Sequence, residues 1–209
     1  MDSLNLVEDT AIRDWLVTGD GSSQTVDISP VVDLSNNTYR LYRFLTDLED
    51  ILRNSDDDCQ RLEAIRPLVR RLLISSEWLQ YEFINPNPET GWSVVTLYDE
   101  PDYPLTVQTV AWHPGKVSPI HNHATWGVVA LLGGQEKNTL WKQVDDNGGI
   151  EKTGEVILNP GEIISFTPDA IHHVEALGDE PTISFNLYGE TDYDARFEFD
   201  IENRTKKNF

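Results

Sequence analysis

The second half of the chain is a succession of short apolar runs rich in Val, Ile, Thr, Phe and Tyr, separated by turn residues. Such runs predict β-strands, because β-branched and aromatic side chains favour a pleated surface. Many short strands with regular turns are typical of a β-sandwich or a β-barrel. The sequence DDNGG at 145–149 predicts a hairpin turn. The runs are WSVVTLY, LTVQTVAWH, GVVALLGG, NTLWKQV, EVILNPGE, IISFTP, HHVEAL and TISFNLYG.

The N-terminal part has a helical texture, with apolar residues recurring at steps of three and four. Pro67 is expected to kink or divide the last of its helices, and the segment TGDGSSQTVDISP, 18–30, reads as a loop. We therefore expect a helical part, 1–84, packed on a mainly β part, 85–209, in one compact unit. The predicted helices are 3–17, 37–54 and 56–74.

Composition limits the partners and the compartment. Sixteen basic against thirty-six acidic residues give a net charge of −20, which disfavours nucleic acid and anionic membranes. No apolar run reaches the roughly 18 residues of a membrane span, and the acidic N-terminus does not resemble a signal peptide. Cys59 is the one cysteine, so no intramolecular disulfide is possible. We expect a cytoplasmic protein.

Two histidines one residue apart, His121 and His123, stand just before a glycine-rich apolar run. Residues i and i+2 of a strand face the same way, so both rings can converge on one point and bind a metal ion. Neutral imidazoles suit iron, copper, nickel or zinc. A third ligand can come from FTPDAIHHVEAL, which holds His172 and His173. Adjacent strand residues face opposite ways, so only one of these two can serve.

The spacing around this pair resembles the first signature of the cupin superfamily: glycine, five residues, His-x-His, three or four residues, glutamate, six residues, glycine. Gly115, His121, His123 and Gly134 match, and Gly127 stands in the glutamate position. The resemblance implies a mainly β, jelly-roll-like cupin barrel. Without the carboxylate the ligands are neutral, so a divalent ion would keep its full charge.

Three segments, PIHNHATWGVV, IHHVE and ISFNLYG, together resemble the thiol dioxygenases, and the bacterial 3-mercaptopropionate type most. That resemblance implies Fe(II) held by His121, His123 and His172. It also implies an oxidoreductase that adds both atoms of O2 to the sulfur of a small thiol carboxylate, 3-mercaptopropionate or cysteine. The product would be a sulfinate.

The family pattern Ser-x-His-x-Tyr, a hydrogen-bonded relay beside the iron, is matched by Ser184 and Tyr188 but not by Asn186. An amide donates and accepts hydrogen bonds but does not exchange a proton near neutral pH. We therefore expect these three residues to be catalytic, with a relay that orients Tyr188 without tuning its acidity. No cysteine lies in the region of Gly127 where animal enzymes crosslink the tyrosine, so no thioether is expected.

A substrate carboxylate needs a cation, and the resemblance assigns it to Arg196, which is followed by an aromatic residue and an aspartate as in the mercaptopropionate type. Trp126 and Phe185 are candidate pocket walls. Two other functions stay open: another metal-dependent cupin enzyme with a different metal, and a ligand-binding cupin without catalysis. The sequence does not predict an oligomeric state.

Overall fold

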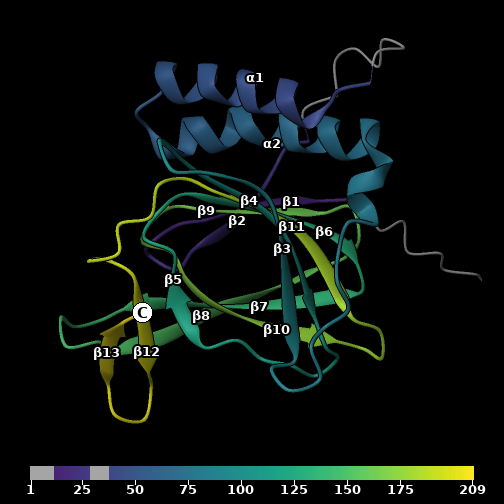
Figure 1. Cartoon of the computed structure of the whole chain (residues 1–209). Coiled ribbons are helices and arrows are strands. Elements are labelled where there is room, and N and C mark those ends of the chain that lie inside the picture. Colours follow the sequence, from purple (N-terminus) through teal and green to yellow (C-terminus); the bar gives the residue numbers. More distant parts are fainter. Residues whose placement is uncertain (1–11, 29–37) are drawn as a thin grey trace, which may run out of the picture.

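The computed structural model describes residues 12–28 and 38–209 (Figure 1). The helices are α1 (Leu41–Asn54), α2 (Asp58–Ser75) and the short 3-10 helix η1 (Glu77–Gln80). The strands are β1 (Asp14–Val17), β2 (Ser23–Val26), β3 (Trp92–Glu100), β4 (Tyr103–Trp112), β5 (Ile120–Asn122), β6 (Gly127–Gly133), β7 (Gln135–Gln143), β8 (Ile150–Leu158), β9 (Ile163–Phe166), β10 (Ile171–Leu177), β11 (Thr182–Tyr188), β12 (Phe197–Asp200) and β13 (Thr205–Asn208).

The strands form two sheets. One has seven strands in the order β2-β1-β9-β6-β11-β4-β3, and the other has six in the order β13-β12-β5-β10-β7-β8. Figure 1 shows α1 and α2 over the outer side of the seven-stranded sheet, with the six-stranded sheet on its other side. The molecule thus has three layers, helices, sheet and sheet.

Alternation along the strands builds a core on each side of the seven-stranded sheet. On β6, Val128 and Ala130 pack with the helices, whereas Val129 and Leu131 pack between the sheets. Successive strand residues point to opposite faces, so one strand serves both cores. The run GVVALLGG is apolar without alternating polar residues because both faces of β6 are buried.

The predicted mainly β, jelly-roll-like fold with N-terminal helices packed on it is confirmed. The two sheets form an open sandwich with edge strands rather than a closed barrel. Each of the eight predicted runs contains a strand, and the predicted turn at 145–149 joins the antiparallel strands β7 and β8.

The helix predicted at 3–17 is wrong over its described end. Asp14–Val17 form β1, which pairs with β9 in parallel and with β2 in antiparallel register. Leu16 joins the core under the helices and Val17 the core between the sheets. Neighbouring residues of β1 thus face opposite cores, but four residues are too few for this strand periodicity to be recognised in the sequence. The pairing with β9 determines the structure of the segment. Residues 3–11 lie outside the described part of the chain.

Two smaller expectations also change. The predicted loop at 18–30 contains β2, which pairs with β1 after a turn at Gly21; residues 29 and 30 are outside the described part. Pro67 does not divide the third predicted helix, because α2 runs continuously through it. Its buried face, with Ile65 and Val69, packs on the sheet and holds the helix together across the proline. Over the described ranges, neither long helix has the length and apolar character needed to cross a membrane.

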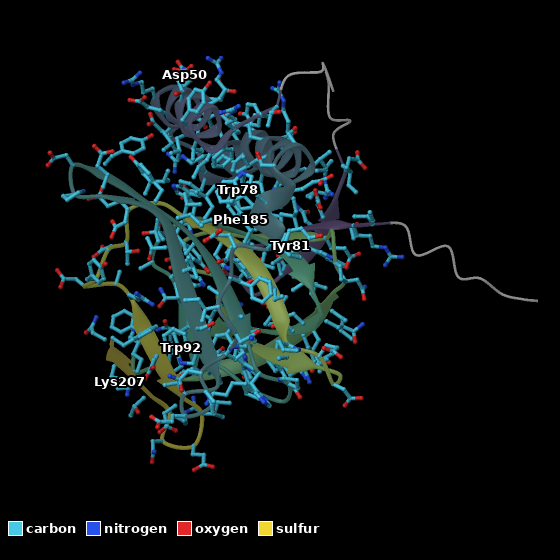
Figure 2. The ribbon with its side chains drawn as sticks, turned by 45° about the vertical axis from the view of Figure 1, so that its right-hand side comes forward. Asp50, Trp78, Tyr81, Trp92, Phe185 and Lys207 are labelled. Carbon is cyan, nitrogen blue, oxygen red and sulfur yellow. The ribbon has the colours of Figure 1, made fainter. Side chains whose placement is uncertain are left out.

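Phe185 points away from the space between the sheets and into the core under the helices (Figure 2). It is fully buried and meets Phe44 of α1 edge to face, with ring centroids 6.4 Å apart. The expectation that Phe185 walls the pocket is therefore wrong.

Replacing this ring tests the helix-to-sheet packing. Phe185→Ala should lower the free energy of unfolding by about 3–5 kcal/mol, because it leaves a cavity in a closed core. Denaturant unfolding measures the loss. Tyr42→Ala, at a position 69% exposed on α1, is the control and should cost little. Equal losses in the two variants would contradict this packing.

Candidate metal centre

Three histidines converge on the space between the sheets. His121 on β5 is the register partner of His172 on β10, and His123 follows β5 directly. One nitrogen from each ring lies within 4.8 Å of the other two. In residues 12–28 and 38–209 this is the one group of His, Cys, Asp or Glu side chains placed to hold a metal ion.

Hydrogen bonds fix which nitrogen of two rings is free. His121 Nδ1 donates to the carbonyl oxygen of Pro119 at 2.9 Å, and His172 Nδ1 donates to Asn138 Oδ1 at 2.8 Å. Both partners are acceptors, so the proton sits on Nδ1 and Nε2 keeps its lone pair. The Nε2 atoms of His123 and His172 are 3.0 Å apart. Two ligands at about 2.1 Å from an ion and at a right angle have that separation.

Burial keeps these rings neutral. It lowers the pKa of His121 to about 4 and the pKa values of His123 and His172 well below 6.5. The Arg196 cation lowers the pKa values of His121 and His123 further, although the hydrogen bond to Pro119 and the Glu198 carboxylate oppose the shift at His121. Neutral imidazole is the form that binds metals, because a protonated nitrogen has no lone pair to give. The three side chains therefore fit a transition-metal ion.

A second layer supports His172 from β7. Asn138 accepts from its Nδ1 and donates through Nδ2 to Glu136 Oε1 at 2.9 Å. Both residues are buried, and burial raises the pKa of Glu136 to about 7 although the bond from Asn138 opposes the shift. An amide that must donate to Glu136 turns its oxygen toward His172, which presets the metal-binding tautomer. Sequence reasoning missed this pair, whose signal is two polar residues at alternate positions of a buried strand.

Gly127 has a steric reason to be glycine. It pairs with Tyr188 across β6 and β11, and a Cβ atom there would lie 2.9 Å from Cδ1 and Cε1 of the tyrosine ring. The ring instead stacks on His123, with centroids 4.5 Å apart and planes 26° from parallel. The tyrosine thus takes space beside the histidines that a side chain at 127 would need.

The inner face of β11 carries a continuous hydrogen-bond chain. Tyr188 OH donates to Asn186 Oδ1 at 3.1 Å, and Asn186 Nδ2 donates to Ser184 Oγ at 2.9 Å. Burial, and to a smaller degree the nearby Glu136 carboxyl, raise the pKa of Tyr188, so the phenol stays protonated. Since its proton is committed to Asn186, the hydroxyl presents acceptor lone pairs to the cavity.

The histidines lie in a cavity of about 440 Å³ between the sheets, here called the histidine cavity. Arg196 lines it too, and its Nε is buried without a hydrogen-bond partner in the described structure. Its guanidinium lies 4.1 Å from the ring centre of Phe209, which meets His121 edge to face. Among the described residues, no carboxylate lies within 4.0 Å of Arg196 to form an ion pair with it.

Two other candidates lie elsewhere. His173 faces away from its neighbour His172, and its Nδ1 accepts a hydrogen bond from Trp141 Nε1 at 3.1 Å. Trp126 is 6% exposed, belongs to the core under the helices and lines a separate recess beside Gly189. The structure thus brings together His121, His123, His172, Ser184, Asn186, Tyr188 and Arg196 around one cavity, but not Trp126.

Comparison with known proteins adds loose likenesses. No protein-family model matches the chain. A recombinant oxalate oxidase in complex with glycolate aligns at 12% identity and a TM-score of 0.41, over 53% of this chain and 56% of that one. A protein from Klebsiella pneumoniae with a double-stranded β-helix domain aligns at 16% identity and a TM-score of 0.43, over 54% of this chain and 83% of that one. A cupin-2 domain from Rhodospirillum rubrum aligns at 14% identity and a TM-score of 0.40, over 49% of this chain and 62% of that one. The chain thus spans about half the length of the oxalate oxidase, and likenesses this loose carry no argument about activity.

Neighbouring histidines provide a matched test of the metal centre. His172→Ala should lose most of the metal retained after purification and dialysis, because it removes a ligand. His173→Ala should retain it, since that ring faces away. Elemental analysis measures both, with circular dichroism as the check on folding. The reverse pattern would show that the assigned ligand is wrong.

Gly127→Ala should force the ring of Tyr188 off His123 and cost about 1–3 kcal/mol of stability through overpacking. Gly154→Ala on β8 is the matched control, because a Cβ atom there meets nothing within 4 Å. Thermal or denaturant unfolding compares the two variants. A harmless Gly127→Ala would mean that the ring has room to move.

Proposed function

We propose that this chain is an Fe(II)-dependent thiol dioxygenase with a cupin site. It would convert a thiol carboxylate such as 3-mercaptopropionate or cysteine to its sulfinate, RSH + O2 → RSO2H. The observation that carries the proposal is a group of three neutral imidazoles placed to hold a metal ion, beside a glycine, Gly127, in the position of the cupin glutamate, where the ring of Tyr188 takes the space that a side chain would need. Bound iron would supply the Lewis acidity that deprotonates the thiol and the redox chemistry with O2.

His121, His123 and His172 would hold the ion and leave its charge undiminished, since none carries a negative charge. Asn138, ordered by Glu136, keeps the Nε2 lone pair of His172 aimed at the centre. The effect is a positive centre open to anionic ligands. A thiolate is such a ligand, and so is the carboxylate of a cupin substrate of another class.

Arg196 would hold the substrate carboxylate. Its cation lies near enough to His121, His123 and Tyr188 to shift their pKa values, and its Nε lacks a partner. A guanidinium binds a carboxylate through paired hydrogen bonds, which fixes the orientation of the ligand as well as its position. Arg196 would thereby turn the thiol end toward the histidines.

Tyr188 would position the reacting end of the substrate. Its hydroxyl accepts a hydrogen bond from a ligand while it donates to Asn186, and it can donate to a ligand only by giving up that bond. Asn186 holds this arrangement without titrating near neutral pH, and Ser184 orients the amide in turn. The chain Ser184–Asn186–Tyr188 would thus act as a fixed orienting device.

Oxygen uptake by the iron-loaded protein tests the proposal. 3-Mercaptopropionate and cysteine should give sulfinates containing both atoms of labelled O2, whereas cysteamine, which lacks the carboxylate, should react poorly. Arg196→Gln should raise KM for the two acids by roughly tenfold or more, because it removes a charged hydrogen bond to the carboxylate. The KM for cysteamine should be unchanged.

Arg204→Gln is the matched control, because Arg204 is exposed and pairs with Asp145 outside the cavity. Absence of sulfinate from every thiol would refute the dioxygenase. Stoichiometric zinc, nickel or manganese in the native protein would favour another metal-dependent cupin enzyme. Tight ligand binding with no oxygen uptake would favour a binding protein.

A further inference from the structure

The histidine cavity continues well past the histidines along β4 and β3. On β4 the residues at alternate positions, Thr106, Gln108, Val110 and Trp112, all line it. In register with β11, Thr106 lies opposite Tyr188 and Gln108 opposite Asn186, whereas Trp112 lies opposite Thr182. The cavity therefore has a polar end beside Tyr188 and an apolar end at Trp112.

The apolar end, here called the tryptophan arm, consists of Trp92 and Val94 on β3 and Val110 and Trp112 on β4. Trp92 pairs with Trp112 in register, and their ring centroids are 6.1 Å apart. Trp92 is 43% exposed. An indole left open on a cavity wall offers a flat surface on which an aromatic or apolar group can pack.

The cavity, from its polar end to the end of the arm, is too long for a three-carbon acid. Trp112 lies four residue steps along β4 from Gln108, which is near Asn186, and at the rise of a strand this is about 13 Å. The volume of about 440 Å³ also falls in the range of pockets that enclose drug-sized ligands, roughly 300–1,000 Å³. A small thiol carboxylate at the histidines would leave the arm to water.

The two ends of the cavity favour different chemical groups in one ligand. At the polar end Arg196 has a buried Nε without a described partner, which favours an anion. At the other end stand two indoles and two valines, which favour an apolar group. Charge and apolar surface are thus complementary to an acid with a large apolar substituent.

We propose that the ligand of this site is a carboxylate with an aromatic-sized apolar body, which packs in the tryptophan arm against Trp92 and Trp112. For the thiol dioxygenase proposed above, on which this part rests, the substrate is then a mercapto acid with a bulky apolar substituent. The arm itself binds the apolar body whether or not the ligand contains sulfur.

Acids without sulfur test binding in the tryptophan arm independently of thiol oxidation. Calorimetry on the full chain, loaded with iron(II) and kept free of oxygen, compares 3-phenylpropionate with propionate. The phenyl acid should bind at least about tenfold more tightly, because the arm takes the ring out of water. Trp92→Ala should lose most of that gain and Trp92→Phe should keep much of it.

Trp78→Ala is the matched control. Trp78 lies on η1, is 50% exposed and stands far from Trp92, near the helices in Figure 2, so the gain should be unchanged. Equal affinity for the two acids, or an undiminished gain in Trp92→Ala, would overturn the proposal.

Oxygen uptake then compares 2-benzyl-3-mercaptopropionate with 3-mercaptopropionate. A higher kcat/KM for the benzyl compound, lost in Trp92→Ala, supports the whole proposal. If phenyl acids bind in the arm but no thiol yields a sulfinate, the ligand class stands and the dioxygenase is refuted. If 3-mercaptopropionate is oxidised while the benzyl group brings no gain in binding or rate, the dioxygenase stands and the tryptophan arm is refuted.

Discussion

The alternation of side chains along β11 is the constraint on which the site depends. Phe185 and Leu187 anchor one face of the strand in the core under the helices, and this forces Ser184, Asn186 and Tyr188 onto the opposite face, in the cavity. A slip of one residue would exchange the two sets, placing polar groups in a dry core and aromatic bulk at the metal centre. Packing on the helices therefore specifies the register that orders the site.

Gly127 determines how Tyr188 of β11 lies beside the histidines. Because it has no side chain, the ring of Tyr188 lies against β6 and stacks on His123. The same contact leaves no room for a carboxylate ligand from that position. One residue thus determines both the neutral ligand set and the place of the phenol, so the two features belong together in this fold.

Patterns local in sequence were predictable and contacts across strands were not. The two-residue spacing of His121 and His123, like the strand runs, is readable because strand geometry is periodic. The helix prediction failed at 14–17 because four residues are too few to show a strand periodicity and because pairing with β9 determines their structure. Trp126 lies outside the cavity although it is close to His123 in sequence, and the Glu136–Asn138 support of His172 depends on the pairing of β7 with β10.

The anionic ligand proposed for this site has to be reconciled with the net charge of −20 of the chain, and distance reconciles the two. Charges on the surface are screened by salt beyond about 8 Å, whereas Arg196 acts inside a partly desolvated cavity where its field is much less weakened. The buried Glu136 lines the same cavity, but burial raises its pKa to about 7, so below neutral pH it is largely protonated and adds little negative charge. Inside the cavity, Arg196 therefore places a positive charge near His121 and His123 although the molecule as a whole is strongly negative. In the proposed function, affinity for a carboxylate would depend on Arg196 and on an ion bound by the histidines, while the outer charge would slow the approach of anions without cancelling their binding.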